Sequence, residues 1–176
     1  MRKELRLSGS GGQGLILAGI ILAEASINQG LNAVQSQSYG PEARGGASKA
    51  EVIISSEEIF FPKVRKPDIL LALSQKAYEK YVHDLDGDSI IVIDDSIEID
   101  ESVKVKATYS LPILKTASEK IGKSMVANIV ALGVLTGLLD GIEKQSVLDA
   151  VLSRVPQGTE DLNKNAFEAG TMLVQK

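Results

Sequence analysis

A glycine-rich turn at residues 9–14 is the part of this chain best suited to chemistry. It reads Gly-Ser-Gly-Gly-Gln-Gly and lies between a short alternating run and a long apolar run. Four glycines in six residues let the backbone turn tightly, and before a helix such a turn presents a row of N–H groups. This arrangement favours binding of a phosphate or another anion. The long amide of Gln13 is also placed to reach a ligand or a partner chain.

A second candidate site is the loop at residues 39–46, Tyr-Gly-Pro-Glu-Ala-Arg-Gly-Gly. Pro41 stiffens the exit from the preceding strand, and small residues leave the guanidinium of Arg44 unobstructed. A guanidinium can contact a phosphate or a carboxylate through two parallel hydrogen bonds. If the strand ends at the C-terminal edge of the sheet, this loop lies near the glycine turn. A plain hairpin loop with an exposed arginine is the alternative.

The spacing of Gly9, Gly11 and Gly14 matches the G-x-G-x-x-G pattern of dinucleotide-binding proteins. The full pattern also needs an acidic residue roughly 20 positions further on, at the end of the second strand, to bind a ribose hydroxyl. Here that strand carries Gln-Ser-Gln-Ser at 35–38 and has no carboxylate before Glu42. The sequence therefore disfavours a nicotinamide dinucleotide site. Glycines that serve only close packing of helix against strand are an open alternative.

Three other positions are weaker candidates. Asp94 and Asp95 follow a buried strand and have the chemistry to bind a metal ion, but an acidic turn is the favoured interpretation. His83 stands among charged residues of an expected helix and is interpreted as a surface residue. Asn128 lies where a turn leads into an apolar helix, and a role at an interface and a role in helix packing are equally supported.

The composition excludes several classes of function. The chain has 176 residues, no cysteine and one histidine, so a cysteine-held iron–sulfur cluster is excluded and a conventional zinc site is not expected. A net charge of −4 and an aromatic content of 4%, without tryptophan, disfavour binding to nucleic acid or to an anionic membrane. The apolar run at 15–23 is too short to span a bilayer. We expect a cytoplasmic protein with a single domain over residues 1–176.

Short strands alternate with helices over most of the chain, and the last third is helical. The expected strands are 4–7, 32–39, 47–55, 69–72, 90–93 and, towards an edge, 103–106, and the expected helices are 15–23, 75–85, 113–121, 126–139, 144–155 and 162–175. The loop between the second and third strands is too short for a crossover helix, so these strands are free to pair antiparallel. The pattern predicts a three-layer α/β/α sandwich with a mostly parallel central sheet, mixed if that pair is antiparallel, and a helical C-terminal third.

Four stretches of the chain, in this order, resemble the gamma subunit of 2-oxoacid:ferredoxin oxidoreductases. They are the glycine turn at 9–14, the loop at 39–46 with its continuation to residue 51, the helix that carries Asn128, and residues 163–170, Asn-Lys-Asn-Ala-Phe-Glu-Ala-Gly. The resemblance covers essentially the whole chain. It is greatest to the 2-oxoglutarate branch of the family, with the pyruvate and branched-chain branches less similar.

The resemblance implies that the chain is one subunit of a larger enzyme of class EC 1.2.7 and is inactive alone. Such complexes oxidatively decarboxylate a 2-oxoacid, transfer the acyl group to coenzyme A and pass the electrons to ferredoxin. Thiamine diphosphate, magnesium and iron–sulfur clusters are expected on companion alpha and beta subunits, and the presence of a delta subunit is left open. This chain would contribute no catalytic residue and no metal ligand, and would aid assembly and the accommodation of coenzyme A. The residues expected to contact coenzyme A or the partner surface are Gly9, Gly11, Gly12, Gln13, Gly14, Tyr39, Arg44, Gly45 and Asn128.

The residues by themselves leave two other classes of protein open. A stand-alone Rossmann-like NAD(P)-binding oxidoreductase or a nucleotide-binding regulator would use the glycine turn as a nucleotide site. A non-catalytic dimeric binding module would bind neither nucleotide nor coenzyme A. The sequence also leaves open which 2-oxoacid is used and in which direction the complex runs.

Overall fold

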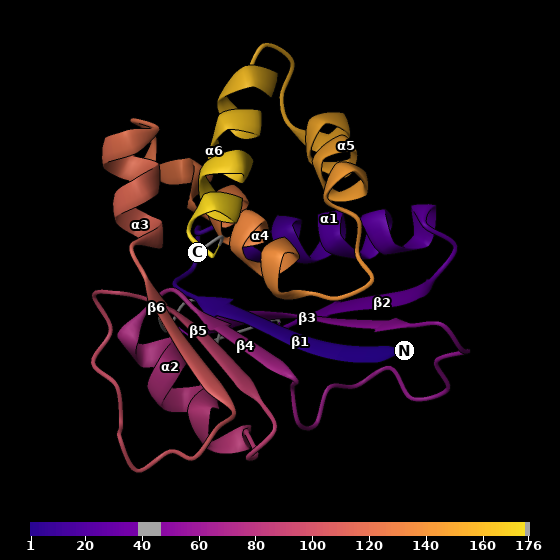
Figure 1. Ribbon diagram of the computed structural model, residues 1–176, viewed down its shortest axis with the longest axis vertical. Helices are drawn as coiled ribbons and strands as arrows, with labels where there is room; N and C mark the ends of the chain where they lie inside the picture. Colours follow the sequence, from indigo (N-terminus) through magenta and orange to yellow (C-terminus); the bar gives the residue numbers. More distant parts are fainter. Residues whose placement is uncertain (39–46, 175–176) are drawn as a thin grey trace.

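A six-stranded mixed sheet forms the centre of the structure, a computed structural model that describes residues 1–38 and 47–174 (Figure 1). Its strands are β1 (Arg2–Gly9), β2 (Asn32–Gln37), β3 (Ser48–Ser55), β4 (Ile69–Ala72), β5 (Ile90–Asp94) and β6 (Ala107–Leu111). They lie side by side in the order β2-β3-β1-β4-β5-β6. Strand β3 is antiparallel to its neighbours β1 and β2, and the other neighbouring pairs are parallel. The antiparallel pairing of the second and third strands is therefore confirmed.

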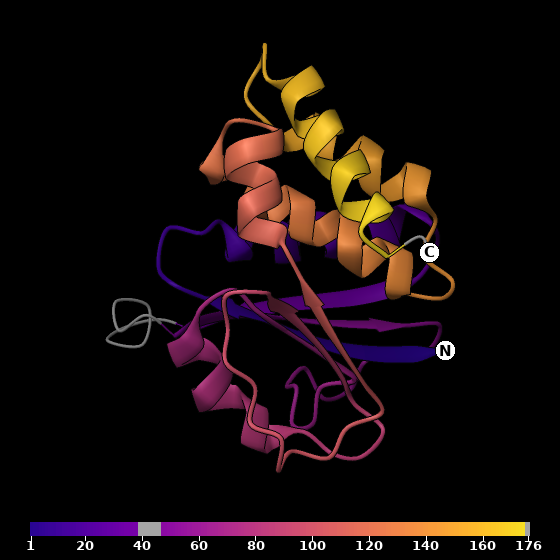
Figure 2. The ribbon, with the colours of Figure 1, turned by 60° about the vertical axis from the view of Figure 1, so that its left-hand side comes forward.

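Helices cover the two faces of this sheet unequally (Figures 1 and 2). One face carries α1 (Leu15–Asn28), α4 (Ala127–Leu138), α5 (Lys144–Arg154), α6 (Glu160–Met172) and α3 (Ile113–Lys115), which continues as a π-helical turn, Thr116–Lys120. Among the helices that the structure describes, α2 (Gln75–Tyr81), with its 3₁₀ continuation Val82–Asp84, alone covers the other face. The predicted three-layer sandwich is confirmed. No helix within residues 1–38 and 47–174 combines the length and the apolar character that a membrane span requires.

The alternation of side chains along the strands builds a separate core on each face. On β1, Leu5 and Leu7 belong to the large core under α1 and α4, whereas Arg6 between them points to the α2 side. The inner strands β4 and β5 are buried on both faces: Leu71 packs into the large core and Leu70 into a smaller core with Tyr78 of α2. Such doubly buried strands explain the continuous apolar runs in the sequence.

The two C-terminal helices α4 and α6 pack closely because glycines stand at their contact. A Cβ atom on Gly133 would overlap the carbonyl oxygen of Phe167, and a Cβ atom on Gly170 would overlap the carbonyl oxygen of Val130. Phe167 is completely buried in the core that also contains Leu5 and Leu7. The helical third of the chain therefore shares the core of the sheet.

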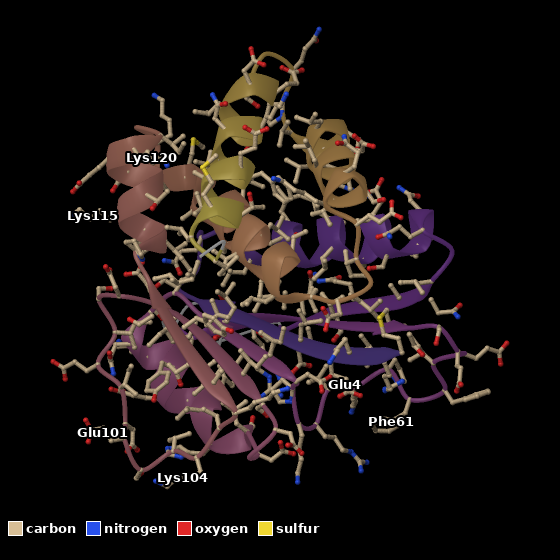
Figure 3. All side chains as sticks on the ribbon, in the orientation of Figure 1. Glu4, Phe61, Glu101, Lys104, Lys115 and Lys120 are labelled. Carbon is tan, nitrogen blue, oxygen red and sulfur yellow. The ribbon has the colours of Figure 1, made fainter. Side chains whose placement is uncertain are left out.

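Two expected elements differ from the structure. The edge strand is β6 (Ala107–Leu111), so the prediction of a strand at 103–106 is wrong. Val103 and Val105 do alternate towards the interior, but they pack against the smaller core instead of pairing with β5. Figure 3 shows Glu101 and Lys104 on this connecting loop. The helix expected at 75–85 is α-helical only to Tyr81 and continues as a 3₁₀ turn.

Candidate functional site

The glycine turn lies where the connections of two neighbouring parallel strands diverge. Strand β1 is followed by the turn and by α1 on one face, whereas its neighbour β4 is followed by α2 on the other face. In open α/β sheets, the crevice at the carboxyl ends of two such strands is the usual place for a ligand. Figure 2 shows the turn at the left-hand edge of the molecule, between α3 and α2. The turn predicted from the sequence therefore occupies the position that the topology favours.

The backbone of the turn requires glycine at two positions. Gly12 and Gly14 have φ angles of 87° and 71°, in the left-handed region that other residues rarely adopt. Gly14 is also the residue that precedes α1, and it offers no side chain to cap that helix. The positive end of the α1 dipole therefore meets the crevice without a capping side chain, a setting that favours a negatively charged ligand group.

The Gln13 side chain shapes this turn from within. Its Oε1 atom accepts a hydrogen bond from the Ser10 N–H (2.7 Å), and its Nε2 atom donates to the carbonyl oxygen of Leu73 (3.3 Å). Leu73 directly follows β4, so the amide links the two strand ends on either side of the crevice. A Cβ atom on Gly9 would overlap Gln13 Oε1, and glycine at that position gives the amide its space. Contact of Gln13 with a ligand remains a prediction.

Asn128 lies on the opposite side of the turn, at the start of α4. It is only 5% exposed, and its Nδ2 atom donates a hydrogen bond to the carbonyl oxygen of Gly14 (3.1 Å). A Cβ atom on Gly14 would come within 2.6 Å of that Nδ2 atom, so the asparagine and the glycine fit each other. Asn128 therefore joins α4 to the turn, 114 positions away in the chain, and its contact with a ligand or a partner chain remains a prediction.

A hollow of about 560 Å³ opens beside the turn, between the turn and the segment that runs from α3 to α4. Its lining residues are Gly11, Gly12, Gln13, Leu114, Ser118, Ser124, Met125 and Ala127. Serine hydroxyls and glycine backbone supply polar groups, while Met125, 78% exposed, supplies an apolar surface. The hollow therefore suits a ligand that has both polar and apolar parts.

The same segment also carries three lysines, Lys115, Lys120 and Lys123, all exposed. Lys115 lies 4.0 Å from Glu119, an exposed pair that leaves most of the lysine in solvent. Figure 3 labels Lys115 and Lys120 beside α3, on the outer side of the molecule. With three lysines and Glu119, residues 113–126 carry a net charge of +2 in a chain whose net charge is −4.

Tyr39, Arg44 and Gly45, the candidates from the second loop, lie outside the described residues. The residues that flank this loop are placed: the backbone N–H of Ser38 donates to the carbonyl oxygen of Lys49 (3.1 Å). Ser48, the first residue of β3, pairs with Gly9, the last residue of β1. The chain therefore re-enters the sheet beside the glycine turn, having left it one strand further away, at the end of β2. The contacts predicted for Arg44 remain a prediction.

The acidic turn after β5 supports local structure. Asp94 Oδ1 accepts a hydrogen bond from the Leu114 N–H (2.7 Å), and Asp94 Oδ2 accepts one from the Ser96 hydroxyl (2.5 Å). Nowhere in residues 1–38 and 47–174 do three or more histidine, cysteine, aspartate or glutamate side chains come together as a metal site. His83 is exposed in the 3₁₀ turn after α2. Asp94 thus fixes the start of α3, in line with the acidic-turn interpretation.

One polar cluster was not identified from the sequence. Arg6 is 3% exposed, and its guanidinium pairs with Glu51 (Nε–Oε1 2.8 Å) and with Asp84. Lys49 Nζ lies 3.0 Å from the same Glu51 carboxylate, and the Arg6 Cζ atom lies 5.2 Å from the centre of the Tyr81 ring. The sequence signal for this cluster was a charged residue among apolar ones on each of two strands: Arg6 on β1 and Glu51 on β3. Their pairing depends on strand order, which the sequence does not specify.

Known proteins resemble this chain along almost its whole length. The model of the pyruvate ferredoxin/flavodoxin oxidoreductase family matches residues 4–173. The chain is 54% identical over 173 residues to the 2-oxoglutarate synthase subunit KorC of Methanocaldococcus jannaschii, a match that covers 97% of this chain and 92% of that protein.

Two solved structures share this fold. The gamma subunit of a keto/oxoacid ferredoxin oxidoreductase from Geobacter sulfurreducens is 44% identical, with a TM-score of 0.88, and the match covers 98% of this chain and 96% of that chain. The 2-oxoglutarate:ferredoxin oxidoreductase of Magnetococcus marinus, with 2-oxoglutarate, coenzyme A and succinyl-CoA bound, is 26% identical with a TM-score of 0.86. That match covers 98% of this chain but 31% of the Magnetococcus chain.

Proposed function

The chain belongs to the pyruvate ferredoxin/flavodoxin oxidoreductase family, and we propose that it is the gamma subunit of a 2-oxoglutarate:ferredoxin oxidoreductase. The observation that carries this proposal is the 54% identity, over nearly the whole of both chains, to a 2-oxoglutarate synthase subunit. The complex converts 2-oxoglutarate and coenzyme A to succinyl-CoA and carbon dioxide. A pair of electrons passes to ferredoxin. The chain acts in the cytoplasm as one gamma-type domain over residues 1–176.

The chemical steps belong to companion subunits. This chain has no cysteine to hold an iron–sulfur cluster, and its described residues assemble no metal site. Thiamine diphosphate, magnesium and the iron–sulfur clusters are therefore assigned to the alpha and beta subunits, with or without a delta subunit. Thiamine diphosphate would supply the carbanion chemistry of decarboxylation.

The contribution of this chain is to help bind coenzyme A and to close the site against water. Coenzyme A carries phosphates and a long, partly apolar arm. The uncapped end of α1 and the backbone of the glycine turn suit the phosphates, and the hollow lined by Met125 and Leu114 suits the arm. Arg44, in the loop that leads into β3 beside the turn, is proposed to contact a phosphate. Tyr39 and Gly45 belong to the same proposed contact surface.

The alternative, a stand-alone NAD(P)-binding protein, has no support. In a dinucleotide-binding fold, the second strand lies next to the first and brings a carboxylate to the ribose. Here β3 separates β2 from β1, and β2 (Asn32–Gln37) carries no acidic residue. The end of β2 therefore supplies no carboxylate that could bind the ribose of a dinucleotide at the glycine turn.

The first experiment is anaerobic affinity purification of this chain from its own cells. We expect thiamine-binding and iron–sulfur subunits to co-purify, and the complex to reduce a viologen dye with 2-oxoglutarate and coenzyme A but far more slowly with pyruvate. Recovery of a lone protein, or a clear preference for another 2-oxoacid, would contradict the proposal.

The role of Arg44 is tested in the same assay. The substitution Arg44→Ala removes a charge-assisted contact, so we expect the KM for coenzyme A to rise about tenfold or more. Arg65→Ala is the matched control, because it removes the same kind of side chain from an exposed position in another loop. The Arg65 Cζ atom lies 4.6 Å from the centre of the Phe61 ring. Equal kinetics in the two variants would remove Arg44 from the site.

A further inference from the structure

Tyr81, at the end of α2, makes a hydrogen bond that reaches the neighbourhood of the glycine turn. The side chain is 4% exposed, and its hydroxyl donates to the carbonyl oxygen of Ala47 (2.7 Å). Ala47 immediately precedes β3, and the hydroxyl of Ser48, the next residue, donates to the carbonyl oxygen of Gly9 (3.2 Å). Tyr81 is thus connected to the first residue of the turn through two consecutive residues, the one before β3 and the first of β3.

The ring of Tyr81 is surrounded by positive charge that holds it in place. Arg6 Cζ, Lys49 Nζ and Lys80 Nζ lie 5.2, 5.6 and 5.3 Å from its centre. Each cation is attracted to the negative face of the ring. Because Arg6 and Lys49 also share the Glu51 carboxylate, the ring is part of a network fixed to β1 and β3. The Tyr81 hydroxyl is therefore a well-ordered donor.

Tyr81 and α1 lie on opposite faces of the sheet. Helix α2 follows β4 and covers one face of the sheet, whereas the glycine turn leads to α1 on the other face. The Tyr81–Ala47 bond is thus a contact from the α2 side of the sheet to the residue before β3, the strand whose first residue pairs with Gly9. On the opposite side, Gln13 and Asn128 fix the turn by their own hydrogen bonds.

We propose that Tyr81 is a positioning residue for the glycine turn. Its hydroxyl fixes the start of β3, and Ser48 transmits that position to Gly9, so that the turn presents its backbone groups to coenzyme A in one geometry. Tyr81 itself does not touch the ligand. The consequence for coenzyme A rests on the proposed function, whereas the effect on the turn does not.

The test compares Tyr81→Phe with Tyr78→Phe. Both side chains are buried on α2, and the Tyr78 hydroxyl accepts a hydrogen bond from the Asp100 N–H (3.0 Å), in a loop of the smaller core. Each variant loses the hydrogen bond that its hydroxyl makes to the backbone and keeps its ring. Hydrogen exchange of residues 9–14 is measured in the full chain, and the KM for coenzyme A and kcat are measured in the assembled complex.

We expect Tyr81→Phe to speed exchange at residues 9–14 about fivefold, the factor that one neutral hydrogen bond carries. The KM for coenzyme A should rise by a similar factor with kcat unchanged, and Tyr78→Phe should alter neither quantity. Unchanged exchange in Tyr81→Phe, or equal changes in both variants, would overturn the proposal. Faster exchange with an unchanged KM would support the positioning role and count against coenzyme A binding at the turn.

Discussion

The two faces of the central sheet are stabilised in different ways. The face under α1, α4 and α6 is packed with apolar side chains, and its helices approach closely at Gly133 and Gly170. The face towards α2 has a smaller apolar core beside a buried ionic cluster around Arg6. One face therefore depends on complementary shape, and the other on pairing of charges and hydrogen bonds.

This difference bears on the candidate site, because the glycine turn lies between the two faces. Asn128 contacts the turn from the α4 side, whereas Tyr81 reaches it from the α2 side through β3. Shape complementarity is sensitive to added volume. A buried ion pair is sensitive to loss of one partner, and less so to replacement of both. The following variants separate these two kinds of sensitivity.

The largest expected effect is on the shape-dependent face. Gly170→Ala places a Cβ atom against the Val130 carbonyl, so α4 and α6 must move apart. We expect the free energy of unfolding to fall by about 3 kcal/mol or more, measured by urea denaturation. Gly87→Ala is the control, because a Cβ atom on Gly87 would meet no other atom within 4 Å, and it should be neutral or slightly stabilising. Equal effects in the two variants would contradict close packing of α4 and α6.

The next effect is on the charged face. Arg6→Met leaves Glu51 buried with Lys49 as its remaining partner and should cost about 2–3 kcal/mol. This is less than for a fully isolated charge, because Lys49 still contacts Glu51 and the Asp84 side chain is 49% exposed. The double variant Arg6→Met/Glu51→Leu should recover most of the loss, since it removes both charges. A double variant as unstable as the sum of the two single variants would show that the cluster is not an isolated ionic unit.

The smallest expected effect concerns the hydrogen bond that Asn128 of α4 donates to the glycine turn. Asn128→Ala removes the hydrogen bond to the Gly14 carbonyl, which still accepts from the Ala18 N–H, so we expect a loss of about 1 kcal/mol. Asn163→Ala is the control, because Asn163 is also buried and its amide donates to the backbone carbonyl and the hydroxyl of Thr159, far from the turn in the sequence. Both variants should lower the melting temperature to a similar extent. Only Asn128→Ala should speed hydrogen exchange at residues 9–14.

Local patterns in the sequence predicted much of the fold. The glycine turn, the buried strands β4 and β5 and the antiparallel β2–β3 pair follow from glycine density, apolar runs and a short loop. Each of these signals acts over a few residues. The edge strand β6 was missed, because none of its five residues is fully buried and its apolar pattern is weak. The valines before it, Val103 and Val105, alternate as a strand would but pack on the smaller core.

The sequence located the glycine turn of the candidate site but did not indicate the hydrogen bonds that hold it. The residue types of the turn at 9–14 were sufficient to locate it at the end of β1. Its link to Leu73 joins residues 60 positions apart, and the pair of Arg6 with Asp84 joins residues 78 apart. No periodicity or spacing in the sequence specifies such pairs. They arise only once the strand order brings β1 between β3 and β4.

The sequence by itself determined the family resemblance, the place of the glycine turn and the absence of cysteine chemistry, because these depend on residue identity and short-range geometry. The tertiary structure decided how the turn is held. Gln13 bonds from the turn to the residue after β4, while Asn128 of α4 and the Tyr81–Ala47–Ser48 connection reach the turn from outside. The physical reason is that hydrogen bonds and buried charges require specific partners in space. Those partners are set by strand order and helix packing, which are properties of the whole fold.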